Sequence, residues 1–288
     1  MMKLIWKKLK TYSALVMFEH TAFALPFAYL ALFLAAEGWP SFYNFFWVTI
    51  AMIGARNGAN AWNRLADMKI DKKNPRTAER HLPSGEVSPR EVLGLTVFCF
   101  GLLVLAAFKL NSICVYLLPV AIFIVVFYSY TKRFTWMCHL FLGAADALAP
   151  VGTWIAVTGG LSWGVLIIGL IQALWIAGFD VIYGTQDYEF DIKEGVHSIP
   201  ARFGVKKALK IAQSFHFLTI VLLISLYFFF PLGSIYFIGI FLITILLIHE
   251  HKLVSPDDLS QVKIASYSIN QIIGPLLFLT TMLDIIIF

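Results

Sequence analysis

The chain has 288 residues, of which 59% are hydrophobic and 14% are charged, and its formal net charge is +5. The length alone would allow one or two soluble domains, but this composition excludes an ordinary globular protein and indicates a polytopic membrane protein. The basic excess is explained by membrane topology, so it is no evidence for nucleic-acid binding. The composition indicates that membrane lipid surrounds the chain, and no obligate protein partner is evident from the sequence.

Nine apolar segments are each long enough to cross a bilayer as a helix. They lie near residues 13–36, 41–61, 90–108, 112–130, 137–157, 162–183, 207–230, 233–249 and 264–287. Helices are expected throughout, because isolated strands are not viable in the bilayer core. No long polar linker separates two halves. We therefore expect an all-α protein with one transmembrane domain over residues 1–288.

The basic residues define the expected orientation. Of the 22 lysines and arginines, all except Arg56 and Lys109 fall at the N-terminus, in the loops after the second, fourth, sixth and eighth spans, or at the span ends that border these loops. Loops rich in Lys and Arg stay in the cytoplasm. The N-terminus and these loops are thus expected on the cytoplasmic side of a prokaryotic inner membrane, with the C-terminus outside.

An acidic and basic stretch follows the second span and reads NRLADMKIDKKNPRTAERHLPSG from Asn63 to Gly85. Asn63, Asp67 and Asp71 are spaced i, i+4, i+8, so on a helix they form one stripe of oxygen ligands. Stacked carboxylates repel one another unless a cation lies between them, and hard oxygen ligands suit Mg²⁺. This pattern predicts a metal-binding helix face.

A second stretch, Asp180–Arg202, repeats this arrangement after the sixth span, with Tyr183, Asp187 and Asp191 at four-residue spacing. Ordinary loop charge would explain one such acidic cluster. It is a poor explanation for two clusters that have the same four-residue spacing and lie on the same membrane face. The turn at Tyr128–Arg133 is expected on that face as well. Three loops therefore predict one active site for a metal-chelated polyanion, and diphosphate is the natural candidate.

Cations near the acids are candidates for direct diphosphate contact, because arginine offers forked donors and lysine a compact charge. They are Arg76, Arg80, Lys132, Arg133 and Arg202. Arg56 lies inside a span and should point into the polar cavity, since an arginine facing lipid is unfavourable. Asp146 also lies inside a span. The sequence does not decide whether it lines the cavity, pairs with a cation or is protonated. The His249–Lys252 cluster is expected to be a solvated loop.

At these residues the chain resembles the UbiA superfamily of intramembrane aromatic prenyltransferases, over nearly its full length. Asn63, Asp67 and Asp71 match the first motif, N-x-x-x-D-x-x-x-D, and RTAERHLPSG looks like its R-T-x-x-R-P-L-P-S-G continuation, with His81 replacing the usual proline. The Y-x-x-x-K-R motif is matched by Tyr128, Lys132 and Arg133. The second acidic motif, D-x-x-Y-x-x-Q-D-x-x-x-D, is matched by Asp180, Tyr183, Gln186, Asp187 and Asp191.

The resemblance implies Mg²⁺-dependent transfer of a prenyl group from a polyprenyl diphosphate to an aromatic acid, in a central cavity capped by cytoplasmic loops. The implied metal ligands are Asn63, Asp67, Asp71, Asp187 and Asp191. Arg80, Lys132 and Arg133 would neutralise the departing diphosphate. Asp180 would lie beside the acceptor ring, with Tyr128 and Tyr183 lining the pocket. The implied catalytic residues are Asp180, Asp191 and Lys132.

The loop motifs look most like the 4-hydroxybenzoate polyprenyltransferases of quinone biosynthesis. Arg64 replaces an aspartate common in that group, and Glu19 and His20 replace an Arg-Pro pair. A hydroxylated naphthoate of menaquinone synthesis is therefore a close alternative acceptor. An ion-coupled transporter is the alternative from another class, but it predicts charges near the midplane and broken helices. Here the acids gather at one face, and only Asp146 and Arg56 lie deeper.

Overall fold

The computed structural model of the chain describes residues 2–17 and 21–288. The regular secondary structure of these residues is helical, with no β-strand. The all-α prediction is confirmed for this part of the chain. Glu19 and His20, which distinguish the first predicted span, lie outside the described residues.

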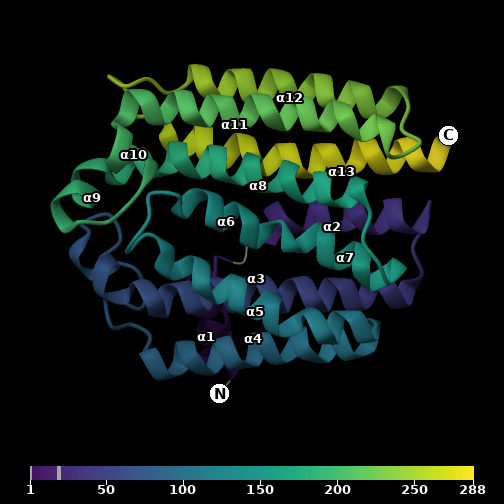
Figure 1. The fold of residues 1–288 in the computed structure, drawn as a ribbon. Coiled ribbons are helices and arrows are strands. Elements are labelled where there is room, and N and C mark those ends of the chain that lie inside the picture. Colours follow the sequence, from purple (N-terminus) through teal and green to yellow (C-terminus); the bar gives the residue numbers. More distant parts are fainter. Residues whose placement is uncertain (1, 18–20) are drawn as a thin grey trace.

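The long helices run side by side in one bundle (Figure 1), with short helices α9 and α10 at the end that holds the acidic segments. In chain order the helices are α1 (Met2–Leu15), α2 (Thr21–Ala36), α3 (Phe42–Lys73), α4 (Pro89–Leu110), α5 (Ser112–Thr131), α6 (Cys138–Asp146), α7 (Leu148–Thr158), α8 (Trp163–Gly184), α9 (Tyr188–Glu194), α10 (Ile199–Phe203), α11 (Val205–Ser225), α12 (Ser234–Lys252) and α13 (Asn270–Ile287). Two 3₁₀ turns, η2 (Thr185–Asp187) and η3 (Leu226–Phe228), and one π-helical segment, η4 (Ile264–Ile269), connect them.

Seven helical segments of the described chain are long and apolar enough to cross a membrane, which marks an integral membrane protein. They are Pro89–Leu110, Ser112–Thr131, Cys138–Thr158, Trp163–Glu194, Val205–Phe228, Ser234–Lys252 and Ile264–Ile287. The first two predicted spans fall on α2 and α3. The apolar part of α2, Ala24–Ala36, is shorter, and α3 is long but carries the polar stripe in its second half.

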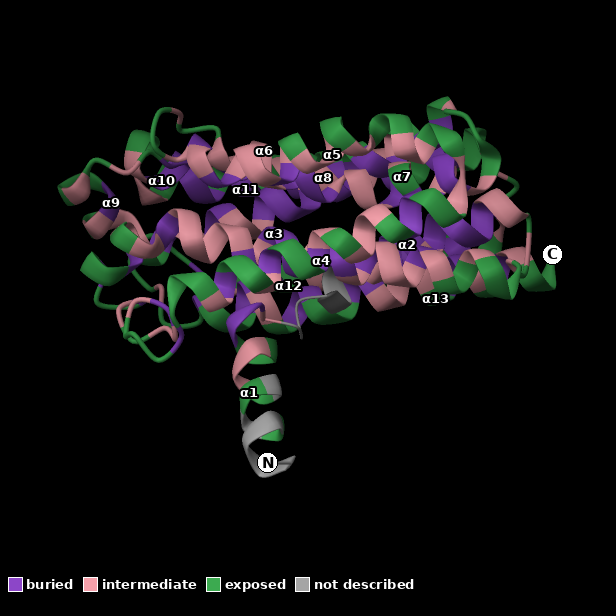
Figure 2. Ribbon diagram, turned by 90° about the horizontal axis from the view of Figure 1, so that it is seen from below, coloured by how far each residue is buried: buried purple, intermediate pink, exposed green. Residues whose placement is uncertain are grey.

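The first predicted span, residues 13–36, is divided between two helices. Helix α1 ends at Leu15 and α2 begins at Thr21, and α1 projects crosswise from the bundle (Figure 2). The far end of α1 exposes Trp6, while Lys8 and Tyr12 each donate a hydrogen bond to Glu91 at 3.1 Å. Glu91 also forms a capping box with Ser88 at the start of α4.

The fifth predicted span consists of two helices, α6 and α7, that meet at Ala147. Proline lacks the N–H that would bond to the carbonyl four residues earlier, so Pro150 leaves the Asp146 carbonyl without that helical bond. The break falls at a residue that the sequence analysis had singled out.

The main hydrophobic core joins α2, α8, α11, α12 and α13 through Phe27, Trp175, Leu223, Tyr236 and Ile273. Helix α8 lies within the bundle, between α6 and α11 in Figure 1, and it is apolar on most of its faces, as a fully packed helix requires. Close approach to α6 depends on Gly143, where a Cβ would lie 2.2 Å from the Ala173 carbonyl oxygen of α8.

The prediction that His249–Lys252 form a solvated loop is wrong for Glu250. Helix α12 continues through these residues to Lys252, and Glu250 is fully buried. Its carboxylate accepts a hydrogen bond from Asn270 Nδ2 at 3.1 Å. A buried carboxylate needs such a partner, and Asn270, the first residue of α13, supplies it.

Candidate active site

Helix α3 carries the first acidic stripe into a polar cavity. The helix continues beyond its apolar half to Lys73, where the Asn74 N–H bonds to the Ile70 carbonyl. Asn63, Asp67 and Asp71 therefore share one helical face. All three line a cavity of about 280 Å³, and Asp67 and Asp71 are buried.

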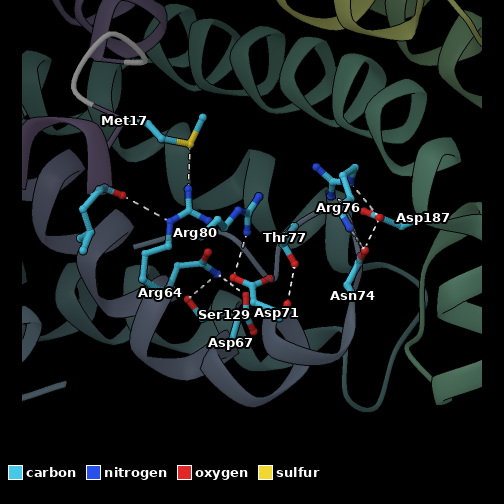
Figure 3. Close-up of polar contacts among 12 residues, drawn as sticks. Met17, Arg64, Asp67, Asp71, Asn74, Arg76, Thr77, Arg80, Ser129 and Asp187 are labelled. Carbon is cyan, nitrogen blue, oxygen red and sulfur yellow. Dashed lines mark hydrogen bonds and ion pairs between the residues drawn. The ribbon is translucent and has the colours of Figure 1, made fainter. Parts of the chain in front are cut away.

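Each acid of this stripe is paired with a cation from outside α3. Figure 3 shows the pair between Asp71 and Arg80. Lys132 Nζ lies 2.6 Å from Asp67 Oδ2, and Arg133 lies 3.3 Å from Asp67 Oδ1. Asn63 Nδ2 also donates to Asp67 at 2.9 Å. Asp71 accepts from Arg80 at 2.9 Å. The cations predicted for diphosphate thus neutralise the carboxylates predicted for metal.

The second acidic segment lies across the same cavity, but it is not one continuous helix. Helix α8 ends at Gly184, and the 3₁₀ turn η2 separates it from α9. Asp187 ends that turn, and its Oδ1 accepts hydrogen bonds from Asn74 at 2.8 Å and from Arg76 at 2.9 Å. Asp191 is buried on α9 and accepts a 2.7 Å bond from Ser198.

Arg76 connects the two acidic segments. Its guanidinium forms an ion pair with Asp187, donates to the Tyr183 hydroxyl, and lies 4.8 Å from the centre of the Tyr183 ring. Partial burial disfavours the charged form of Arg76. The hydrogen bonds to Asp187 and Tyr183 outweigh this effect and raise the pKa of Arg76 above its usual value. Arg76 therefore remains a fixed cation at the cavity wall.

The side chains around the cavity supply the oxygen donor atoms that suit a hard divalent cation. Asn63, Asp67, Asp71, Asp187 and Asp191 all line it, and they offer the oxygen ligands that Mg²⁺ prefers. Within residues 2–17 and 21–288, no group of three or more His, Cys, Asp or Glu residues is arranged to hold a metal. The oxygens of Asp67, Asp71 and Asp187 instead face four cations, Lys132, Arg133, Arg80 and Arg76. Asp191 is bonded to Ser198.

Arg56 and Asp146 form a deeper ion pair, with Arg56 NH1 2.6 Å from Asp146 Oδ1. Both residues line the polar cavity and also an apolar cavity of about 160 Å³. The apolar cavity lies among α3, α4, α5 and α7, and small or aliphatic side chains such as Ala51, Ala55 and Leu118 line it. Asp146, left open by the sequence, is thus a paired residue where the two cavities meet.

Comparison with known proteins identifies the family. The profile of the UbiA prenyltransferase family matches residues 24–272. The chain belongs to the UbiA prenyltransferase family. It is 31% identical over 224 residues to the 4-hydroxybenzoate octaprenyltransferase of Vibrio campbellii, which covers 78% of each chain. It is 33% identical over 175 residues to the 4-hydroxybenzoate octaprenyltransferase of Pseudomonas fluorescens, which covers 61% of this chain and 59% of that one.

Solved structures of UbiA homologs share the fold. The apo structure of a homolog from Aeropyrum pernix K1 has a TM-score of 0.84 at 31% identity, covering 92% of this chain and 98% of that chain. A homolog from Archaeoglobus fulgidus bound to DMAPP and Mg²⁺ has a TM-score of 0.65 at 20% identity, covering 93% and 99%. These findings confirm the predicted family and the transferase class, and this UbiA family member is an integral membrane enzyme.

Most of the predicted site residues of this UbiA family member face one cavity. Arg56, Arg76, Arg80, Tyr128, Lys132, Asp180 and Tyr183 line it together with the five acidic-stripe residues. Arg133 reaches Asp67 and the Ala66 carbonyl from outside the lining. Arg202 is exposed on α10 and is not among the lining residues.

The sequence analysis missed several residues of this UbiA site. His139 pairs with Asp180, with Nδ1 2.7 Å from Oδ2. Tyr267 lines the cavity from the π-helical segment and meets the Tyr183 ring edge-on. Asn74 bonds to Asp187. Arg64 donates to Met17 Sδ at 2.7 Å. His139 and Tyr267 are single polar residues in apolar segments, so no repeated spacing in the sequence marks them as site residues. Their place in the site is evident only from the fold.

Proposed function

We propose that this enzyme transfers a polyprenyl group from a polyprenyl diphosphate to the ring of 4-hydroxybenzoate, with Mg²⁺ as cofactor, in quinone biosynthesis. One observation carries the proposal. A polar cavity lined by both acidic segments meets an apolar cavity at Arg56 and Asp146. The 4-hydroxybenzoate octaprenyltransferases similar to this chain support the choice of acceptor.

The diphosphate would bind where the two acidic segments face each other. Asn63, Asp67, Asp71, Asp187 and Asp191 would hold Mg²⁺, which supplies positive charge to a leaving diphosphate. Their present partners Arg80, Lys132 and Arg133 would then be released to the phosphate oxygens. Arg76 would complete this set of cations. Arg202, exposed on α10, is left out of this proposal.

The prenyl chain would lie in the apolar cavity. Alanine and leucine side chains line it, and the Arg56–Asp146 pair marks its polar end. An apolar, water-poor wall protects a developing allylic cation from hydrolysis. The reactive carbon would thus lie near the junction of the two cavities, with the diphosphate on the polar side.

The acceptor ring would lie beside Asp180, with Tyr128 and Tyr183 as walls and Arg56 facing its carboxylate. The bond between the prenyl carbon and the diphosphate oxygen breaks, and its electron pair leaves with diphosphate. A ring carbon then supplies the electron pair of the new carbon–carbon bond. The proton displaced from that ring carbon passes to the Asp180 carboxylate, which acts as general base.

A hydroxylated naphthoate is the second acceptor to test, because Glu19 and His20 replace the usual Arg-Pro pair of the first span. The experiment is a competition assay with purified enzyme, Mg²⁺, a polyprenyl diphosphate and both aromatic acids, with products separated by mass. Mainly prenylated 4-hydroxybenzoate is expected. Mainly prenylated naphthoate would transfer the assignment to menaquinone synthesis, and no aromatic product would refute aromatic prenylation.

We also propose a single domain of nine transmembrane helices with a cytoplasmic active site. Helix α2 and the apolar half of α3 would add two spans to the seven segments that meet the length and apolarity requirement. The concentration of lysine and arginine beside the acidic segments supports a cytoplasmic position for that end. The C-terminus of α13, at the opposite end of the bundle in Figure 1, would then lie outside.

A further inference from the structure

We propose that His139 is a positioning residue that aims the Asp180 carboxylate at the aromatic acceptor. This inference rests on the proposed function, which places the acceptor ring beside Asp180. Sequence spacing did not indicate His139. Its position follows from α6 and α8, which pack against each other and bring together two residues 41 positions apart in the chain.

The hydrogen bond between the two side chains has a defined direction. His139 Nδ1 lies 2.7 Å from Asp180 Oδ2. An ionised carboxylate only accepts hydrogen bonds, so Nδ1 carries the hydrogen and donates it. This bond engages Oδ2 and leaves Oδ1 for a group inside the cavity. Asp180 is thereby held in one orientation before any substrate binds.

The exposure of the two side chains shows which one faces the substrate. The Asp180 side chain is 26% exposed and the His139 side chain is 6% exposed, although both belong to the cavity wall. Asp180 thus lies in front and His139 behind it. A proton from the acceptor ring would reach Asp180 Oδ1, while the Nδ1 hydrogen of His139 stays in place.

Packing holds the His139 ring in this orientation. Gly184 of α8 leaves space for it, because a Cβ at Gly184 would lie 3.1 Å from His139 Cε1, and Pro200 closes the same side. His139 Nε2 is buried and has no hydrogen-bond partner among the described residues. An unsatisfied buried nitrogen is unfavourable. The 2.7 Å bond to Asp180 offsets the burial of this histidine, and the Cys138 side chain is its second polar neighbour.

The test compares three substitutions in the full-length enzyme. His139→Asn keeps an N–H donor near the Nδ1 position, His139→Gln places its amide near the Nε2 position, and His139→Leu removes both. The kcat and the two KM values are measured with both aromatic acids offered. Prenyl diphosphate binding in Mg²⁺ without acceptor serves as a separate readout, because it does not involve Asp180.

We expect kcat to fall about 10–100-fold in His139→Leu and His139→Gln, the usual loss when a supporting hydrogen bond to a site residue is removed. His139→Asn should stay within about threefold of the wild type, since its donor is retained. Prenyl diphosphate binding should be unchanged in all three variants. The Asn and Gln variants have similar polarity, so their difference does not depend on general destabilisation.

Two results would overturn the inference. One is a His139→Leu enzyme with wild-type kcat, and the other is a His139→Asn enzyme as slow as His139→Gln. Either would leave the proposed function intact if the wild type prenylates an aromatic acid. A wild-type enzyme that prenylates neither acid would instead remove the proposed function, and this inference with it.

Discussion

At the residue scale, the Arg56–Asp146 pair is a buried ion pair to which we also assign a substrate-binding role. The two atoms are 2.6 Å apart, and the Asp146 and Arg56 side chains are 7% and 16% exposed. Breaking a buried pair by removing one partner leaves an uncompensated charge, which typically costs about 3–5 kcal/mol. Loss of activity in a single Arg56 variant would therefore not distinguish lost acceptor binding from lost stability.

A double substitution separates these two effects. We expect Arg56→Leu alone to lower the unfolding temperature in detergent. Arg56→Leu with Asp146→Leu should recover most of it, because neither charge of this pair is then left without its partner. The KM for the aromatic acid should stay strongly raised in both, while that for the prenyl diphosphate changes little. Arg90→Ala, exposed at the start of α4, is the control. A double variant with wild-type acceptor KM would contradict the proposed role of Arg56.

The residue types of the site could be predicted from sequence, but their pairing could not. The four-residue spacing of Asn63, Asp67 and Asp71 is a local signal that a helix preserves. The bond from Lys132 to Asp67 joins residues 65 positions apart, so no local sequence spacing predicts it. Glu250 shows the same limit, since the sequence describes it as a loop charge, whereas in the fold it is buried and bonded to Asn270 of α13.

At the element scale, α6 and α8 together form the side of the cavity that we assign to the acceptor. Helix α6 carries His139 and Asp146, and α8 carries Asp180. Sequence predicted both helices from apolar length alone. The prediction of one continuous fifth span overlooked the break at Asp146, although Pro150 marks it in the sequence. The 3₁₀ turn before α9 could not be predicted, because it depends on contacts with the first acidic loop.

The crossing of α6 and α8 can be tested at Gly143. A Cβ there would lie 2.2 Å from the Ala173 carbonyl oxygen, so Gly143→Ala should separate the helices and destabilise the protein by about 1–3 kcal/mol or more. We expect a lower unfolding temperature and a lower transfer rate. Gly101→Ala on α4, where the added methyl meets no atom within 4 Å, should be neutral or slightly stabilising. Equal unfolding temperatures for the two variants would contradict the close crossing.

At the scale of the whole molecule, both acidic segments lie at one end of the bundle (Figure 1). The expected sidedness can be measured with single cysteines in a chain whose Cys99, Cys114 and Cys138 are replaced. We expect cysteines at Glu79 and Glu189, both exposed, to react with a membrane-impermeant thiol reagent only from the cytoplasmic side. Ser112→Cys, at the start of α5, should react only from outside. Labelling of Glu79→Cys and Ser112→Cys from the same side would contradict the proposed topology.

The central claim is that the two acidic segments act together on one metal-bound diphosphate. The most direct measurement is the rate of prenyl transfer at saturating Mg²⁺ by Asp67→Ala and Asp191→Ala, one substitution in each segment. The exposed acids Glu79 and Glu189 provide matched alanine controls. Each site variant should lose at least about 100-fold, as when one charge-stabilising group is removed, while the controls keep wild-type rates and all four proteins stay folded. Near-normal transfer by either Asp67→Ala or Asp191→Ala would contradict the account.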